Sequence, residues 1–156
     1  MEYYTNYPSP IGDLLLTSDG NSLTGLYLPA QRKPEAIAAG NDLPLFAAAK
    51  NWLDMYFAGD PMPVTFPLLP RGTDFQRNVW QILLTVPYSK TVTYGQIARL
   101  LSPSMSAQAV GGAVGKNPIS IIIPCHRCIG ANGQLTGYAG GLEAKKWLLK
   151  HEEETK

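Results

Sequence analysis

The chain has 156 residues, of which 45% are hydrophobic and 16% are charged, a composition typical of one globular domain or two small lobes. Its formal net charge of +1 neither indicates nor excludes nucleic acid as a partner, because a small basic face is compatible with a balanced total. No window is long and apolar enough to span a membrane, and the N-terminal stretch MEYYTNYPSP lacks the pattern of a signal peptide. We therefore expect a cytoplasmic protein with reduced thiols and no membrane partner.

The first part of the chain predicts a small sheet with one helix. The segments GDLLLTS and SLTGLYL flank the turn signal Asp19-Gly20, which predicts a β-hairpin. Apolar residues at helical spacing predict a helix over residues 43–57, and the proline-containing VTFPLLP after it is expected to be extended at a sheet edge. The segment LPRGT is the best lobe boundary, so we expect domains over residues 1–70 and 71–156.

Three helices are predicted after this boundary, and two of them begin with a capping box. Thr73 with Gln76 marks the first start, and Thr93 with Gln96 marks the second. The short turn SPSMS then leads into a third helix, AQAVGGAVGKNP. Helix, short turn and helix in this order predict a helix-turn-helix.

The third of these helices is rich in small residues. Between Ala107 and Gly115, Gln108 is the only long polar side chain. Glycine inside a helix costs about 1 kcal/mol relative to alanine, which indicates either close helix packing or close approach to a ligand. Such a helix carries few groups that read the major groove and suits the minor groove, with its N-terminal amides near phosphate.

The remaining segments predict a strand, ISIIIP, a loop with both cysteines, and a final helix over GLEAKKWLLKHEEE. In this helix Leu142, Trp147, Leu148 and His151 are expected near one buried face, with the charged end in solvent. The expected fold class is α/β of the α+β kind. A small N-terminal sheet-plus-helix lobe is followed by a mostly helical C-terminal lobe with the helix-turn-helix and the cysteines.

Cys125 and Cys128 are the only cysteines and lie on either side of His126. A redox disulfide at this spacing is expected to open a helix, but turn-forming residues follow it. A structural zinc site needs four ligands, and the other histidine is remote in sequence, so we expect no metal. The residues alone leave two alternatives, an inert buried cysteine or an activated nucleophile.

A nucleophilic cysteine needs a base, and the base needs a group that orients it. Adjacent residues on an extended chain point to opposite sides, so contact between Cys125 and His126 requires a turn or a bridging water. Glu152 follows Leu148 by four residues and borders the buried face of the last helix, which makes it a candidate orienting group. It is also consistent with the solvated run of glutamates over residues 152–154.

The segments AVGGAVGKNP, IIIPCHR and TGYAGGLEAKKWLLKHE occur in this order within residues 73–152. Together they strongly resemble the O6-alkylguanine-DNA alkyltransferases. The resemblance implies a protein that needs no cofactor. It binds double-stranded DNA from the minor-groove side as a monomer. It flips an alkylated guanine, with O4-alkylthymine as a second candidate base, and transfers the alkyl group irreversibly to a cysteine.

The resemblance also implies the catalytic residues. Cys125 is the alkyl acceptor, and His126 is its base through a water. Glu152 holds the tautomer of His126, and Asn117 ties the active-site turn together. Tyr94 donates toward guanine N3 and helps to neutralise the leaving base.

Further positions follow from the same resemblance. The residues implied to bind the base are Tyr94, Tyr138, the amide of Ala139, and the backbone carbonyls at Cys125 and Cys128. The residues implied to contact DNA are Gln108, Ala109, Gly111 and Arg127.

The chain departs from the family pattern at three places. Gln108 stands where the family usually has an arginine that fills the gap left by the flipped base. Cys128 stands where a branched aliphatic residue is common, and it is either a small hydrophobic residue or a thiol that can be oxidised. The zinc ligands found in the N-terminal lobe of some members are absent.

Two other functions compete with this interpretation. A non-catalytic helix-turn-helix protein would bind alkyl lesions without chemistry, but such relatives replace the cysteine that this chain keeps. A Cys-His hydrolase acting on small esters or peptides would turn over, whereas an alkyl acceptor reacts once.

Overall fold

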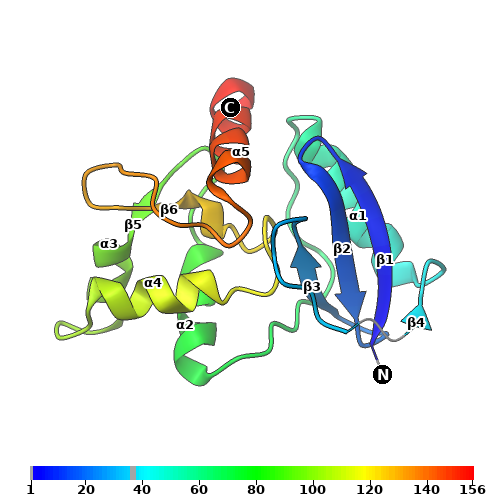
Figure 1. Cartoon of the computed structure of the whole chain (residues 1–156), viewed down its shortest axis with the longest axis horizontal. Coiled ribbons are helices and arrows are strands. Elements are labelled where there is room, and N and C mark those ends of the chain that lie inside the picture. The colour runs from blue at the N-terminus through cyan, green and yellow to red at the C-terminus, as the bar shows by residue number, and fades with distance from the viewer. Residues whose placement is uncertain (1, 36–37) are drawn as a thin grey trace.

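The N-terminal part of the chain forms a four-stranded sheet covered by one helix (Figure 1). The computed structural model describes residues 2–35 and 38–156. The strands are β1 (Tyr3–Ser9), β2 (Gly12–Ser18), β3 (Leu23–Tyr27) and β4 (Ala38–Ala39). Their order is β3-β2-β1-β4, in which β2 pairs antiparallel with both neighbours and β4 pairs parallel with β1. β1 and β4 are not among the predicted elements.

The predicted hairpin is confirmed by β2 and β3. In its turn the carboxylate of Asp19 accepts hydrogen bonds from the backbone N–H groups of Asn21 at 2.9 Å and Ser22 at 2.8 Å. Gly20 has a φ of 107°, a backbone conformation that glycine adopts readily. The Asp-Gly signal therefore identified this turn because both residues serve its geometry.

Helix α1 (Pro44–Phe57) confirms the predicted helix and covers one face of the sheet (Figure 1). Its proline lies in the first turn, where a missing N–H loses no helical hydrogen bond. The buried residues on its inner face are Leu45, Phe46, Ala49, Trp52, Leu53 and Tyr56. They join Leu14 and Leu16 of β2 in one hydrophobic core.

The free edge of β3 links the two halves of the chain. Residues 61–70 run to this edge but form only one parallel bridge, between Leu68 and Leu23, because their prolines interrupt a regular ladder. The predicted extended edge is thus present without a full strand. At the same edge, Leu26 forms a parallel bridge with Ile119, which precedes the cysteines.

The C-terminal half contains the predicted helix-turn-helix. Its first helices and short strand are α2 (Asp74–Leu83), β5 (Val92–Thr93), α3 (Tyr94–Leu101) and α4 (Ala107–Gly115). Both capping boxes are confirmed, because Thr73 pairs with Gln76 and Thr93 with Gln96, each in both directions. Residues 102–106 join α3 to α4 and complete the motif.

The predicted strand over ISIIIP is wrong. Ile119 forms a single bridge, and residues 120–123 after it form turns. Ile121 has a φ of 71°. All of these isoleucines are buried, so the apolar run correctly indicates burial but not strand geometry. The cysteines follow in η1 (Cys125–Arg127), a short 3-10 helix, and β6 (Cys128–Ile129), which pairs parallel with β5.

Helix α5 (Leu142–Thr155) confirms the last predicted helix, although its buried face differs from the prediction. Lys145, Leu148 and Glu152 are its buried residues, whereas Leu142 is 42% exposed. Among the described residues, no helix combines the length and apolar character that a bilayer crossing needs.

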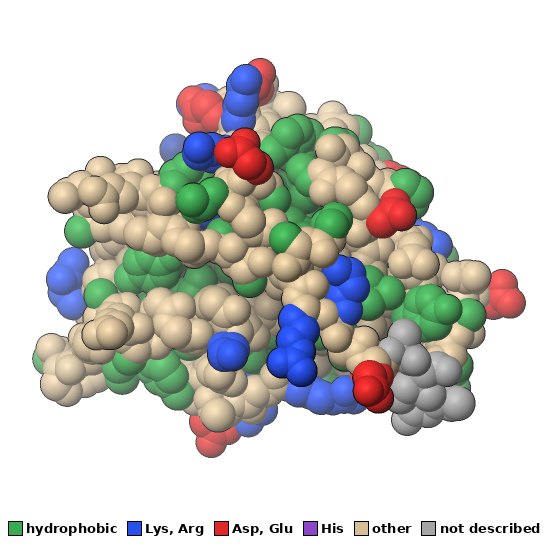
Figure 2. All heavy atoms as spheres, in the orientation of Figure 1, with side chains coloured by type: hydrophobic (Ala, Val, Ile, Leu, Met, Phe, Trp, Pro, Cys, Tyr) green, Lys and Arg blue, Asp and Glu red, His purple; other side chains and the backbone are tan. Residues whose placement is uncertain are grey.

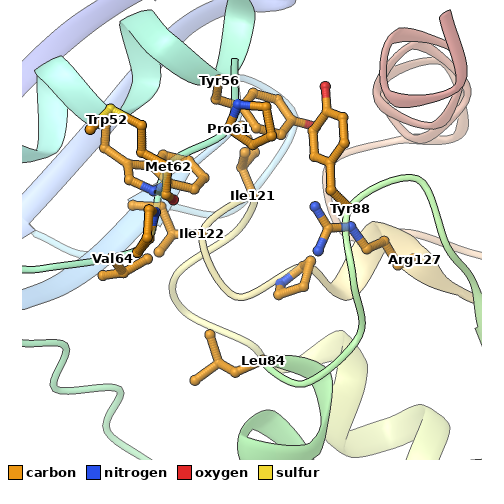
Figure 3. A pocket seen from close by; sticks show the side chains of 12 residues that line it. Trp52, Tyr56, Pro61, Met62, Val64, Leu84, Tyr88, Ile121, Ile122 and Arg127 are labelled. Atoms are coloured by element: carbon orange, nitrogen blue, oxygen red, sulfur yellow. Dashed lines mark hydrogen bonds between the residues drawn. The ribbon is translucent and has the colours of Figure 1, made fainter. Parts of the chain in front are cut away.

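Aromatic side chains of α1 and α5 meet between the two lobes. The rings of Phe57 and Trp147 lie 5.7 Å apart, and the ring of His151 lies 5.3 Å from that of Tyr56. Nε2 of His151 also donates to the backbone carbonyl of Tyr56 at 2.8 Å. Figure 3 shows a cavity at this junction, lined from both lobes by residues that include Trp52, Met62, Val64, Leu84, Ile122 and Arg127.

Candidate active site

Cys125 opens η1 and lines a narrow cavity of about 20 Å³, roughly the room of one water molecule. The cavity is enclosed by α3, α4, the turn over residues 117–124, the loop over residues 130–141, and α5. Burial raises the pKa of the Cys125 thiol, while nearby Asn117, Tyr138 and Ser120 oppose this rise. The resting side chain is therefore a thiol, and it needs a base before it can act as a nucleophile.

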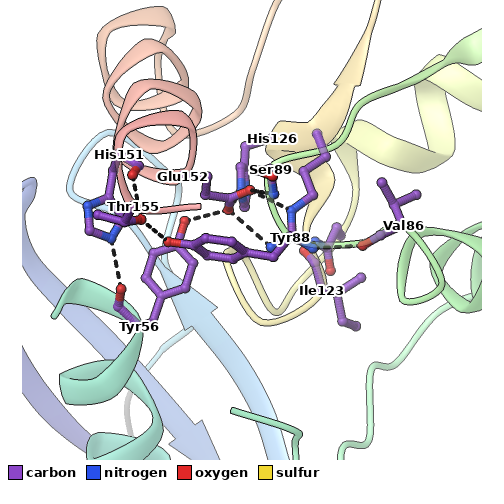
Figure 4. A network of polar contacts seen from close by, with 11 residues as sticks. Tyr56, Val86, Tyr88, Ser89, Ile123, His126, His151, Glu152 and Thr155 are labelled. Atoms are coloured by element: carbon purple, nitrogen blue, oxygen red, sulfur yellow. Dashed lines mark hydrogen bonds and ion pairs between the residues drawn. The ribbon is translucent and has the colours of Figure 1, made fainter. Parts of the chain in front are cut away.

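His126, Arg127 and Glu152 form a buried network next to this cysteine (Figure 4). Oε2 of Glu152 accepts from Nε2 of His126 at 2.6 Å, and Oε1 accepts from Nε of Arg127 at 2.8 Å. Nη1 of Arg127 donates to the carbonyl of Val86 at 2.8 Å. Glu152 is 0% exposed while Glu153 is exposed, so Glu152 does not belong to the solvated run.

Two further donors reach Glu152 from distant parts of the chain. The hydroxyl of Tyr56 donates to Oε2 at 2.6 Å, and the backbone N–H of Ser89 donates to Oε1 at 3.0 Å. Ser89 has a φ of 63°, which is uncommon for a residue other than glycine. Strained backbone conformations of this kind often occur at functional sites. Donors from α1, from Ser89 and from η1 thus hold the carboxylate of Glu152 in place.

The donors around Glu152 decide which nitrogen of His126 carries the proton. An ionised carboxylate only accepts hydrogen bonds, so Nε2 carries the proton and Nδ1 is the acceptor. Nδ1 is buried without a hydrogen-bond partner in residues 2–35 and 38–156. Within that same part of the chain no hydrogen bond joins His126 to the thiol of Cys125.

The charge states within the network follow from burial and pairing. Burial alone would raise the pKa of Glu152, but hydrogen bonds from His126 and Arg127, together with the charge of Arg127, hold it well below its usual value. Burial lowers the pKa of His126 despite the opposing effect of Glu152, and the Arg127 charge lowers it further. The negative Glu152 is already balanced by Arg127, so a second positive charge on His126 would lack a partner. We therefore take His126 as neutral.

Acidification is expected to destabilise the protein in two steps. His126 has its folded pKa below the usual 6.5, so below about pH 6.5 the unfolded state binds a proton that the folded state does not. Glu152 adds a second loss below about pH 4.5, because its folded pKa is also lowered. Urea unfolding measured between pH 8 and pH 3 tests this, and an unfolding free energy that stays constant from pH 7 to pH 5 would contradict a neutral His126.

Asn117 holds the turn that precedes the cysteines. Its Nδ2 donates to the carbonyl of Ile123 at 2.9 Å, and its Oδ1 accepts from the N–H of Ile119 at 3.0 Å. The side chain is 4% exposed and also lines the Cys125 cavity. Asn117 thereby spans the two ends of the isoleucine turn.

Tyr94 lines this cavity from α3, and Tyr138 lines it from the loop over residues 130–141. The hydroxyl of Tyr94 is 2.9 Å from that of Thr136, so α3 and the loop over residues 130–141 are joined by a hydrogen bond. The hydroxyl of Tyr138 is buried and has no partner among the described residues. Ala139 follows it along the cavity.

Lys145 is a cavity residue that the sequence interpretation missed. It is 1% exposed, and its Nζ donates to the carbonyl of Cys128 at 2.6 Å. It precedes Leu148 by three residues and Glu152 by seven, so helical periodicity alone would have placed it on the buried face. Burial raises the pKa of the Cys128 thiol to about 12.

The residues expected to contact DNA occupy two different environments. Gln108 and Ala109 are exposed in the first turn of α4, and Gly111 lines the Cys125 cavity next to the ring of Tyr94. Arg127 is only 9% exposed, and its guanidinium pairs with Glu152. This position does not support a DNA contact for Arg127, because its guanidinium is buried and forms an ion pair with Glu152.

Within the described ranges, no group of three or more histidine, cysteine, aspartate or glutamate side chains has an arrangement that could hold a metal ion. Both cysteines are free thiols.

Comparisons with known proteins give two family matches. The DNA binding domain of 6-O-methylguanine DNA methyltransferase matches residues 74–154, and the ribonuclease-like domain of the same family matches residues 2–70. The methylated-DNA–protein-cysteine methyltransferase of Haemophilus influenzae is 46% identical over 154 residues, covering 97% of this chain and 86% of that protein. The protein of the same name from Methanosarcina acetivorans is 43% identical over 154 residues, covering 96% and 97%.

A solved structure gives the same result. The crystal structure of Mycobacterium tuberculosis OGT in complex with DNA is similar with a TM-score of 0.86 and 44% identity, covering 98% of this chain and 94% of that one. Fold and site together define a cysteine-dependent transferase with a helix-turn-helix lobe. The chain belongs to the 6-O-methylguanine DNA methyltransferase family, and it is an enzyme of the methylated-DNA–protein-cysteine methyltransferase class.

Proposed function

We propose that the protein reverses DNA alkylation directly, by moving the alkyl group from O6 of guanine to Sγ of Cys125. O4-alkylthymine is a second candidate base. The observation that carries this proposal is the buried Cys125 thiol next in sequence to His126, whose Nε2 lies 2.6 Å from Oε2 of Glu152. Because the thioether product is stable, each molecule reacts once.

In the proposed reaction the thiol proton passes through a water to Nδ1 of His126. The sulfur attacks the alkyl carbon, an S–C bond forms, and the C–O6 bond breaks with its electron pair left on the base. A hydrogen bond donated by Tyr94 toward N3 helps to neutralise the charge that develops on the leaving guanine, and the amide of Ala139 donates to O6. The carbonyls at Cys125 and Cys128 receive the guanine amino group. Lys145 does not prevent this at Cys128, because a carbonyl oxygen can accept two hydrogen bonds.

The base must be rotated out of the duplex before this reaction, because the sulfur cannot reach O6 inside a base stack. A cavity with the room of about one water is too small for a purine. We therefore propose that the loop over residues 130–141 moves when the base enters. The hydrogen bond between Tyr94 and Thr136 would break in that step and release the tyrosine hydroxyl for the base.

We propose that α4 meets double-stranded DNA from the minor-groove side. Its small residues permit close approach, and the side chain of Ser106 caps its N-terminus by accepting from Ala109 N–H at 3.0 Å. Figure 2 shows Lys and Arg side chains near the C-terminal end of α4, where Lys116 and Arg32 line one shallow depression. Contacts of this kind to phosphate predict salt-sensitive binding. We also propose that the protein is a monomer with domains over residues 1–70 and 71–156. It would act in the cytoplasm, associated with the nucleoid.

Gln108→Arg is expected to raise the rate of alkyl transfer from duplex DNA by roughly tenfold, because a longer charged side chain better fills the gap left by a flipped base. Gln108 is exposed at the start of α4, so the change should not disturb folding. Single-turnover rates on duplex DNA measure the effect, and Gln81→Arg, at an exposed position on α2, adds the same charge outside α4 as a control. Equal rates for Gln108→Arg and the unchanged protein would refute this role for the position.

The stoichiometry of transfer separates the proposal from its rivals. With labelled O6-methylguanine duplex in excess, we expect one methyl group per protein molecule, and none for Cys125→Ser. A non-catalytic lesion-binding protein would retain the duplex without removing methyl groups. A hydrolase would continue past one equivalent, which would exclude the proposed chemistry.

A further inference from the structure

A tyrosine of the N-terminal lobe reaches the carboxylate that holds His126. Tyr56, on α1, donates its hydroxyl to Oε2 of Glu152 at 2.6 Å, and His126 binds the same oxygen at 2.6 Å. Figure 4 shows Tyr56 and His126 approaching Glu152 from different elements. Tyr56 and Glu152 are 96 residues apart in sequence, so this contact depends on how the two lobes pack.

The surrounding side chains fix the direction of the Tyr56 hydroxyl. Its ring stacks on Trp52 with centroids 5.5 Å apart and meets the ring of Tyr88 edge-on at 5.9 Å. His151 binds the backbone carbonyl of Tyr56 from α5. Tyr56 is 0% exposed, although it borders the cavity between the lobes together with Tyr88 (Figure 3). The hydroxyl therefore has one available direction, toward Glu152.

The shared oxygen links the tyrosine to the base. Burial, followed by the charge of Glu152, raises the pKa of Tyr56, so the phenol stays neutral and can only donate to the carboxylate. A hydrogen bond to a charged group is stronger than one between neutral groups, and it withdraws negative charge from Oε2. Tyr56 and His126 thus share the same carboxylate charge.

We propose that Tyr56 is a positioning residue for the methyl transfer reaction, acting on His126 through Glu152. This inference rests on the proposed function of Cys125 and His126. It makes the N-terminal lobe part of the reactive site, because removal of one hydroxyl on α1 alters the orientation and the basicity of the imidazole on η1.

Tyr56→Phe tests the proposal, because phenylalanine keeps the ring and its packing and removes only the donor. We expect single-turnover methyl transfer to slow by roughly three- to tenfold, because Tyr56 acts through Glu152 and only part of the lost hydrogen-bond energy reaches the rate. Tyr88→Phe is the matched control. Its hydroxyl, in the same aromatic cluster, binds Thr155 and not Glu152, so its removal should leave the rate unchanged. Thermal unfolding and circular dichroism of both variants report on folding.

The pH dependence of the rate distinguishes positioning from a merely structural role. The groups that face His126 are Glu152 and Lys145 from α5, Arg127 beside it on η1, and Tyr56 from α1 through Glu152. Without the Tyr56 donor, Oε2 is more negative and favours protonated His126. The acidic limb of the rate profile should therefore move to higher pH in Tyr56→Phe and stay unmoved in Tyr88→Phe.

A further variant completes the test. Should Tyr56→Phe not fold, 3-fluorotyrosine at position 56 keeps the packing and strengthens the donor, and it should move the acidic limb to lower pH. An unchanged rate and limb in either folded Tyr56 variant overturns the proposal. Absence of methyl transfer by the unchanged protein would instead reject the proposed function itself.

Discussion

Replacing Glu152 by alanine is expected to lower the free energy of unfolding by about 3–5 kcal/mol, because it leaves the buried guanidinium of Arg127 without its partner. The same change removes the acceptor of His126 and leaves the donors Tyr56 and Ser89 unpaired. With the tautomer of His126 no longer fixed, methyl transfer should fall below detection. Urea unfolding and single-turnover transfer measure the two effects.

Glu153→Ala is the control for this prediction. Glu153 is the next residue on α5, is exposed, and pairs only with the exposed Lys156. Exposed pairs of this kind contribute about 0–1 kcal/mol. If the two alanine variants were equally stable and equally active, the network around Glu152 would have neither of the roles given to it.

Replacing Asn117 by alanine is expected to cost about 3 kcal/mol of stability, because two well-formed buried hydrogen bonds are lost and a carbonyl and an N–H are left unpaired. The freed turn would no longer hold Ile121 in its positive-φ conformation. Cys125 follows directly, so we also expect transfer to slow by roughly a hundredfold through misplacement of the sulfur.

Two variants sharpen the Asn117 test. Asn117→Asp keeps the acceptor for Ile119 but replaces the donor to Ile123 with an oxygen, so it should be nearly as damaging. Asn132→Ala removes an exposed asparagine from the loop over residues 130–141 and should change little. Equal stability of Asn117→Ala and Asn132→Ala would show that the turn does not depend on the asparagine.

Local sequence signals predicted the elements whose geometry is determined locally. The capping boxes at Thr73 and Thr93 and the Asp19-Gly20 turn were all confirmed, because each uses hydrogen bonds between residues a few positions apart. The helix-turn-helix followed from these starts. β1 was missed although Tyr3, Thr5 and Tyr7 alternate as in a strand.

The isoleucine run shows where such signals fail. An apolar run indicates burial, and here Asn117 supplies hydrogen bonds that replace those of a strand partner. Burial of the run was therefore predictable, while its turn geometry depended on one polar side chain upstream.

The Glu152 network was only half predictable for a similar reason. The pair of His126 and Glu152 follows from the family resemblance and is present in the structure. Tyr56 and Ser89 reach the same carboxylate from 96 and 63 residues away, and no spacing rule identifies such contacts. The resemblance placed Arg127 at the DNA surface, and no local signal indicated its pairing with Glu152, which lies 25 residues later on α5.

The central claim is that Cys125, and not Cys128, is the alkyl acceptor. It is tested most directly by peptide mass spectrometry after one equivalent of O6-methylguanine duplex has reacted. We expect a single methyl group on Sγ of Cys125, with Cys128 unmodified, because Cys125 lines the cavity whereas Cys128 does not line it and is 0% exposed. A methyl group on Cys128, or no methyl group on either cysteine with saturating duplex, would contradict it.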